Sequence, residues 1–159
     1  MRKIILASQS PRRQALLAQM GLTNYEVDFI SVDESIRPGE KPENYVLRMS
    51  REKAKAVAKK HPDDIVVAAD TAVVLDGTVF GKPDSKDKAA EMLSALSGRW
   101  HEVMTGLTVI SGSLEQSVLE TVRVLFRELT PSEIAAYIAT GEPMDKAGAY
   151  GIQGRGAVL

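Results

Sequence analysis

The chain has 159 residues, of which 44% are hydrophobic and 26% charged, as in ordinary globular domains. Its 20 basic and 21 acidic residues leave a net charge of −1, so no overall field attracts nucleic acid or an anionic membrane. The absence of cysteine excludes disulfides and thiolate metal sites. The N-terminal apolar run is too short for a signal peptide, and no run is long enough to span a bilayer. We therefore expect a cytoplasmic domain with neither a nucleic-acid nor a membrane partner.

The segment SQSPRR follows a short apolar strand near the N-terminus and begins a helix that ends before Gly21. Ser10 suits the N-cap of this helix, and the proline suits its first position. Arg12 and Arg13 then lie in the first turn, where the helix dipole disfavours cations, beside free N–H groups and the hydroxyls of Ser8 and Ser10. This combination predicts a phosphate site. A basic, solvated helix start is the alternative.

A polar stretch, residues 31–42, follows a strand predicted over residues 25–29 and contains the adjacent acids Asp33 and Glu34. Acids in loops are usually just solvated. These two become candidate site residues only if folding brings one of them close to another acid of a site.

A helix is predicted over residues 42–60, with a proline near its start and lysines at its end. Its apolar face contains Val46, Met49 and Val57, and Lys53 lies in the middle of that face. A lysine there either extends outward to solvent or reaches into a cleft. The sequence leaves both alternatives open.

Residues 65–69 are five apolar residues after a turn, which is typical of a strand buried on both faces. The run ends at Asp70, and ligands of open α/β sheets bind beyond the carboxyl ends of strands. Asp70 is therefore predicted to be a site residue at a strand end. A helix cap or a turn is the alternative.

A hairpin is predicted next, with strands over residues 72–75 and 78–80 around an Asp-Gly turn. A two-residue turn would place Thr71 opposite Lys82, whereas a three-residue loop would place Asp70 opposite Lys82. We favour the second register. An acid and a lysine side by side at the mouth of a sheet would suit a metal-assisted reaction on phosphate. A surface ion pair is the alternative.

The second half of the chain predicts a helix over residues 85–96, a long hairpin with strands over residues 101–110 and 118–126, and a helix from residue 130 to about 140. The last helix begins with a capping box, because Thr130 precedes Glu133 by three residues.

The final segment, DKAGAYGIQGRGAVL, has four closely spaced glycines, which indicates a backbone that approaches something tightly. Tyr150 and Gln153 lie among them and could stack on and hydrogen-bond a planar base. A glycine-rich surface loop without a ligand is the alternative. Residues 156–159 are predicted to belong to a strand.

Three motifs, LASQSPRR, AADTAVVLDG…GKP and DKAGAYGIQG, occur in the order found in the Maf family, the septum-formation-like nucleoside triphosphate pyrophosphatases. The chain resembles this family over essentially its whole length. The resemblance implies one α/β domain over residues 1–159, with an elongated mixed β-sheet flanked by helices and a central cleft between two lobes, similar to inosine triphosphate pyrophosphatase. Relatives continue into a further strand and a helix, so we expect the C-terminal strand and helix to be missing here.

The resemblance also implies an activity, namely cleavage between the α and β phosphates with a divalent cation such as Mg²⁺ or Mn²⁺. Asp70 would accept the proton of the attacking water or bind the metal, Glu34 would assist with metal or water, and Lys82 would complete the catalytic set. The residues implied to bind phosphate are Ser8, Ser10, Arg12, Arg13, Lys53 and Lys82.

Thr71 after the acid, together with Arg12 and Gln153, resembles the specificity positions of the branch acting on dTTP and UTP. A branch that prefers 7-methyl-GTP has Gln in place of Thr. A nucleotide-binding regulator of septum formation, without turnover, is the alternative function, although binding alone would not require both acids and four cations. A homodimer is left open as the assembly.

Overall fold

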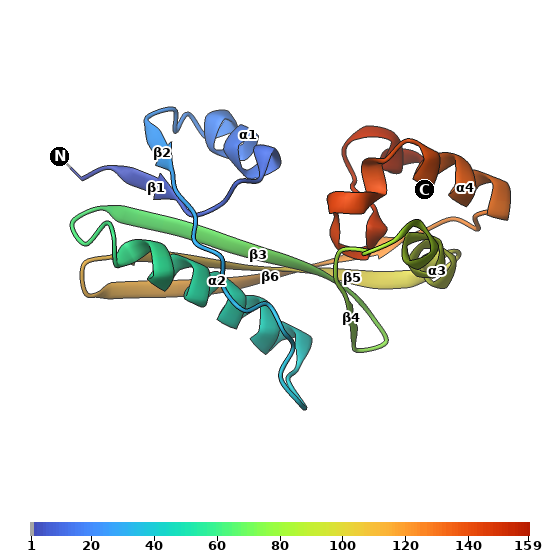
Figure 1. Cartoon of the computed structure of the whole chain (residues 1–159), viewed down its shortest axis with the longest axis horizontal. Coiled ribbons are helices and arrows are strands. Elements are labelled where there is room, and N and C mark those ends of the chain that lie inside the picture. Colours follow the sequence, from blue (N-terminus) through green and yellow to red (C-terminus); the bar gives the residue numbers. More distant parts are fainter. Residues whose placement is uncertain (1) are drawn as a thin grey trace. The chain divides into compact units, whose positions relative to one another are not determined.

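The structure is a computed structural model that describes residues 2–159, and over these residues it forms a mixed six-stranded sheet with four α-helices (Figure 1). The strand order is β2-β1-β3-β5-β6, and β4 pairs with β3. The predicted α/β class is therefore confirmed. The strands are β1 (Ile4–Leu6), β2 (Tyr25–Val27), β3 (Ile65–Leu75), β4 (Thr78–Phe80), β5 (Trp100–Ser111) and β6 (Leu114–Leu125).

The predicted helices are all present, with ends that differ from the predictions by at most a few residues. Three short 3₁₀ segments follow the last of them. None of the helices within residues 2–159 has the length and apolar character needed to cross a membrane. The helical segments are α1 (Pro11–Gln19), α2 (Pro42–Ala58), α3 (Lys86–Leu96), α4 (Pro131–Ala139), η1 (Glu142–Asp145), η2 (Ala147–Ala149) and η3 (Gly154–Val158).

The chain divides into two compact units, and β3 passes from the first to the second between Asp70 and Thr71. The first unit consists of Met1–Asp70 and Thr105–Glu120, and the second of Thr71–Met104 and Thr121–Leu159. Each unit has its own hydrophobic core.

In the first unit, β1 lies between two parallel partners, with Ile4 opposite both Tyr25 of β2 and Ile65 of β3. Helix α2 covers one face of these strands, and α1 lies on the other face (Figure 1). The apolar face of α2 explains this packing, because Ala54 and Val57 are fully buried in a core with residues of β1 and β3.

Strand β3 corrects the prediction that a strand ends at Asp70. The strand continues without a break to Leu75, so Asp70 lies in its middle and is neither a cap nor a turn residue. The reason is that Asp70 and Thr71 are only a two-residue polar interruption. The apolar, β-branched sequence resumes at Ala72, and its buried side chains pack in the core of the second unit.

The β3–β4 hairpin corrects the favoured register. Leu75 pairs with Thr78 and Val73 with Phe80, so the turn has two residues, Asp76 and Gly77, and both have positive φ. Two positive φ values match the twist of the flanking strands, which makes this turn preferable to a three-residue loop. Continuing the same register places Thr71, not Asp70, at the position opposite Lys82.

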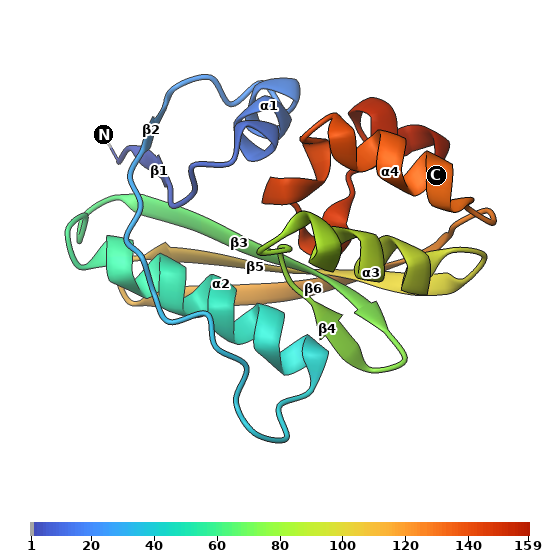
Figure 2. The same ribbon diagram turned by 45° about the vertical axis from the view of Figure 1, so that its right-hand side comes forward.

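The second unit is built on α3 and α4, which lie side by side (Figure 2). Ser85 caps α3 by accepting the N–H of Lys88 at 3.1 Å. The predicted capping box of α4 is confirmed, since Thr130 and Glu133 exchange side-chain and backbone hydrogen bonds. The apolar faces of both helices then pack against Val73 of β3.

The C-terminal segment differs from its prediction, because residues 154–158 form a 3₁₀ turn and not a strand. The expected close approach of the glycines is confirmed, but the neighbour is the protein itself. A Cβ atom on Gly148, which has φ +65°, would lie 2.7 Å from a methyl carbon of Val73. The glycine motif therefore allows the chain to pack tightly onto strand β3.

Candidate active site

Ser8 organises the segment before helix α1. Its buried hydroxyl accepts hydrogen bonds from Nη1 of Arg13 at 3.0 Å and from the backbone N–H of Ser10 at 3.2 Å. Ser10 occupies the predicted N-cap position, but its side chain makes no capping hydrogen bond. The helix therefore does not use the Ser10 hydroxyl, which can serve a ligand.

Arg13 carries the positive charge of this segment toward the acids of the first unit. Burial lowers the pKa of its guanidinium from the ordinary value, and the neighbouring charge of Asp70 acts in the opposite direction, with a smaller contribution from Glu34. Arg12 is exposed to solvent. One partly buried and one exposed arginine at a helix N-terminus are suited to holding an anion.

Lys53 connects two carboxylates that are far apart in the sequence. Its Nζ atom lies 2.6 Å from Oδ1 of Asp70 and 2.8 Å from Oε1 of Glu34. Burial alone would lower the pKa of Lys53, but the two carboxylates outweigh that effect and raise it. The alternative in which this lysine extends outward to solvent is therefore wrong, because the side chain turns toward two acids.

The two adjacent loop acids have different roles. Asp33 accepts the backbone N–H of Ser35 at 2.9 Å, as polar turn residues commonly do, and this contact lowers the pKa of its carboxyl. Glu34 instead meets Lys53 beside Asp70. Folding thus brings Glu34 close to another acid, Asp70, and this was the condition for counting a loop acid as a candidate site residue.

Glu34 and Asp70 are the carboxylates that could hold a divalent cation. Within residues 2–159 there is no cluster of three or more acidic or histidine side chains suited to a metal. Mg²⁺, however, keeps several waters and is usually bound through one or two carboxylates plus substrate phosphates. Two carboxylate oxygens that already converge on one ammonium group fit this requirement.

The remaining candidates, Thr71, Lys82 and Gln153, belong to the second unit and are exposed. The segments that carry two of them are joined, because the N–H of Gly148 donates to the carbonyl of Gly81 at 3.0 Å. This bond links the DKAGAYGIQG motif to the GKP motif.

Tyr150 does not have the predicted base-stacking role. Its side chain is buried in the second unit, its hydroxyl lies 2.6 Å from Nε2 of His101, and its ring packs edge-on against Phe126. Burial raises the pKa of Tyr150 to about 12. The spacing of the glycines gave no sign of this, because it does not show which neighbours of a glycine face inward.

Sequence reasoning also missed Glu142, which fixes the loop after Gln153. Its carboxylate accepts hydrogen bonds from the hydroxyl of Tyr137 and from the backbone N–H groups of Arg155 and Gly156, each at 3.0 Å. The sequence signal for this contact was an acid, Glu142, near a glycine-rich segment, because successive backbone N–H groups in such segments often bind an anion.

The family model of Maf-like proteins matches residues 3–159. A dTTP/UTP pyrophosphatase of Anaeromyxobacter dehalogenans is 51% identical over 161 residues, covering 99% of this chain and 80% of the relative. One of the same name from Moorella thermoacetica is 50% identical over 161 residues, covering 100% of this chain and 82% of the relative. A HAM1 protein of Coxiella burnetii shares the fold, with a TM-score of 0.52 and 19% identity over 77% of this chain and 72% of that one. By sequence, this chain belongs to the Maf-like proteins.

Proposed function

We propose that the chain is a nucleoside triphosphate pyrophosphatase that hydrolyses dTTP and UTP to the nucleoside monophosphate and pyrophosphate. The observation that carries the proposal is the contact of Lys53 with both Asp70 and Glu34, with the charge of Arg13 close to the same acids. Curated relatives about 50% identical over nearly the whole chain are named for this activity.

The attacking group in this reaction is water, and Asp70 is the proposed base. Water adds to the α-phosphorus, its proton passes to the Asp70 carboxylate, and the bond between the α-phosphorus and the oxygen of the β-phosphate breaks to release pyrophosphate. Asp70 acts mainly by orienting this water. Its burial beside Lys53 holds the carboxylate in one position.

The phosphates need positive charge, because negative charge accumulates on them during cleavage. Arg12, Arg13 and the hydroxyls of Ser8 and Ser10 supply cations and donors at the start of α1. We assign Lys53 and Lys82 to the phosphates by resemblance to the family. Mg²⁺ or Mn²⁺, held by Asp70 and Glu34, would neutralise phosphate charge and lower the pKa of a bound water.

Preference for dTTP and UTP is assigned to Arg12, Thr71 and Gln153, again by resemblance. The exposure of Thr71 and Gln153 supports this assignment, because both side chains are accessible to a ligand. The lack of cysteine suits the reducing cytoplasm, where we place the protein.

Pyrophosphate release from each common nucleoside triphosphate, measured with Mg²⁺ and with Mn²⁺, tests the proposal. We expect turnover of dTTP and UTP to exceed that of the purine nucleotides. Binding of a nucleotide without release from any of them would instead favour a regulator of septum formation, and the proposed activity would be wrong.

A further inference from the structure

The loop of residues 31–41, which carries Glu34, is fastened to helix α2 by polar contacts that the proposed mechanism does not use. The hydroxyl of Tyr45 donates to the backbone carbonyl of Glu34 at 3.1 Å. Nη2 of Arg48 donates to the next carbonyl, that of Ser35, at 2.9 Å. Tyr45 and Arg48 are three residues apart and therefore share one face of α2. The helix thus holds two successive peptide groups at the position of the acid.

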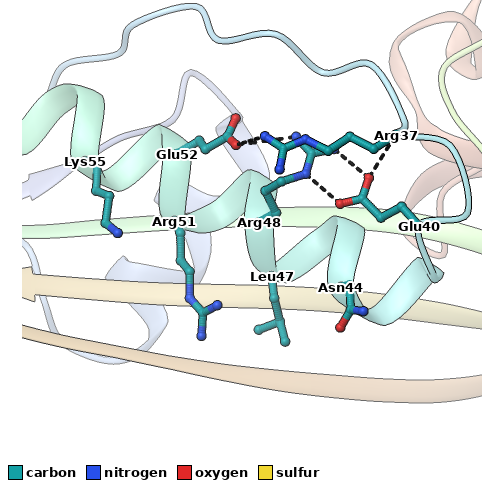
Figure 3. Close-up of a pocket in the computed structure, with 8 residues that line it drawn as sticks. All are labelled: Arg37, Glu40, Asn44, Leu47, Arg48, Arg51, Glu52 and Lys55. Carbon is teal, nitrogen blue, oxygen red and sulfur yellow. Dashed lines mark hydrogen bonds and ion pairs between the residues drawn. The ribbon is translucent and has the colours of Figure 1, made fainter.

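Arg48 is itself held in place by Glu40, at the far end of the same loop (Figure 3). Its Nε and Nη2 atoms each lie 2.6 Å from one oxygen of the Glu40 carboxylate, and both side chains are largely buried. This two-point contact fixes the plane of the guanidinium, which a lysine could not do.

Two further contacts close the loop. The backbone N–H of Arg37 donates to the Glu40 carboxylate at 3.0 Å, and Nη2 of Arg37 lies 3.1 Å from Oε1 of Glu52 on α2 (Figure 3). Arg48 lies 3.5 Å from the same Glu52 oxygen. The loop is therefore attached to α2 at Glu34 and at several residues after it.

These contacts matter because the side chain of Glu34 has little support of its own. Its side chain is 56% exposed and forms an ion pair with Lys53 of α2. A carboxylate on a loose loop would sample many positions, whereas catalysis requires it to stay within a fraction of an ångström. The same helix thus supplies both the cation that meets Glu34 and the side chains that hold its backbone.

We propose that Arg48 and Tyr45 are positioning residues that hold the backbone of Glu34 so that its carboxylate stays beside Lys53 and Asp70. The assignment rests on the proposed pyrophosphatase function. It predicts that loosening the loop slows the chemical step and leaves nucleotide binding largely unchanged.

The test compares Arg48→Lys and Tyr45→Phe with Arg51→Lys, a matched control on the same helix. Arg51 pairs with Glu115 and Ser117, and not with the loop. We expect Arg48→Lys to lower kcat for dTTP by about 10- to 100-fold with little change in KM, because displacements of about 1 Å can have effects of this size. Tyr45→Phe should lower kcat by a smaller factor, and Arg51→Lys should leave kcat unchanged. Amide hydrogen exchange in residues 31–41 should quicken in the first two variants only.

A double-variant cycle separates positioning from general damage. In a Glu34→Ala background, Arg48→Lys should lower kcat by less than about twofold, because residues that act as a unit are not additive. A full additive loss in that background would overturn the assignment, as would unchanged kcat or unchanged exchange in both loop variants. Tyr45→Phe keeps the test decisive if Arg48→Lys folds poorly. Absence of turnover in the unmodified chain would overturn the proposed function itself, and this assignment with it.

Discussion

Nζ of Lys53 lies 2.6 Å from Oδ1 of Asp70, although one residue is on helix α2 and the other is in the middle of strand β3. Both side chains are largely buried. A buried carboxylate beside a single ammonium group is held in one orientation, and Glu34 completes the contact from a third segment. The pair therefore fixes the geometry of the proposed base.

Asp70→Asn should lower turnover by at least about 10²-fold, because the amide cannot accept the proton of the attacking water. The fold should remain, since Lys53 keeps Glu34 as a partner and Asn keeps a hydrogen-bonding oxygen. Pyrophosphate release and thermal unfolding measure the two effects. Asp76→Asn is the control, because Asp76 is an exposed turn residue paired with Arg99. Near-normal turnover in Asp70→Asn would remove the base role.

Glu34→Gln should raise the Mg²⁺ concentration that gives half-maximal activity by at least about tenfold, a loss within the range measured for residues that support metal binding. The reason is that Gln removes one of the two negative charges that converge on Lys53 and that we propose to hold the cation. Activity titrated with Mg²⁺ after treatment with a chelator gives the measurement. Asp76→Asn is again the control. The neighbouring acid Asp33 is unsuitable, because it accepts a hydrogen bond from the backbone of Ser35 in the same loop. Full activity of the unmodified chain in chelator would contradict the metal requirement.

The helix patterns, caps and turn residues could be predicted from the sequence because they depend on neighbours in the chain. Thr130 and Glu133 are three residues apart, and Asp76-Gly77 marked the position of the turn, although the favoured three-residue loop was wrong. The pairing of Lys53 with Asp70 could not be predicted, because helical periodicity shows the face of a lysine but not its partner across the core. The strand through Asp70 was missed for a related reason. The strand continues through Asp70 and Thr71 because the apolar residues before and after them are packed in the two cores, and the local sequence does not show this packing.

Tyr150→Phe should destabilise the protein and leave the KM for dTTP unchanged, because Tyr150 is buried against His101. Removal of the hydroxyl leaves the buried Nε2 of His101 without the partner that it has in the folded protein. The cost of leaving a buried polar group unpaired is about 1–3 kcal/mol. Urea unfolding and steady-state kinetics measure the two quantities. A raised KM with unchanged stability would restore the base-stacking role.

Gly106→Ala should destabilise the first unit, because strand β5 and helix α2 approach each other closely at this glycine. A Cβ atom there would lie 2.4 Å from the carbonyl oxygen of Val46 and 2.9 Å from the backbone nitrogen of Leu47. Backbone atoms cannot move aside as a side chain can, so we expect a loss of at least about 1–3 kcal/mol. Gly81→Ala is the matched control, since Gly81 has open space around its Cβ position and no positive φ. Equal unfolding midpoints for the two variants would contradict this packing.

Acid should weaken the protein partly through Glu40. Hydrogen bonding to Arg48 lowers the pKa of the Glu40 carboxyl from its ordinary value of 4.5 to about 2. A carboxyl whose pKa is lower in the folded state stabilises the fold above the unfolded value, and this contribution is lost as pH falls toward the folded value. The free energy of unfolding should therefore fall between pH 4.5 and about pH 2.

Glu40→Gln removes this titration, so the difference in unfolding free energy between the unmodified chain and the variant should shrink as pH falls through the same window. Chemical unfolding at a series of pH values measures it. Glu133, which Arg127 holds with a pKa of about 2, should give a second such effect in Glu133→Gln. Glu91→Gln is the control, because the pair of Glu91 with Lys88 is exposed and weak. A difference for Glu40→Gln that stays constant down to pH 2 would mean that Arg48 does not hold an ionised Glu40, and the anchor of the Glu34 loop would then lack its charge.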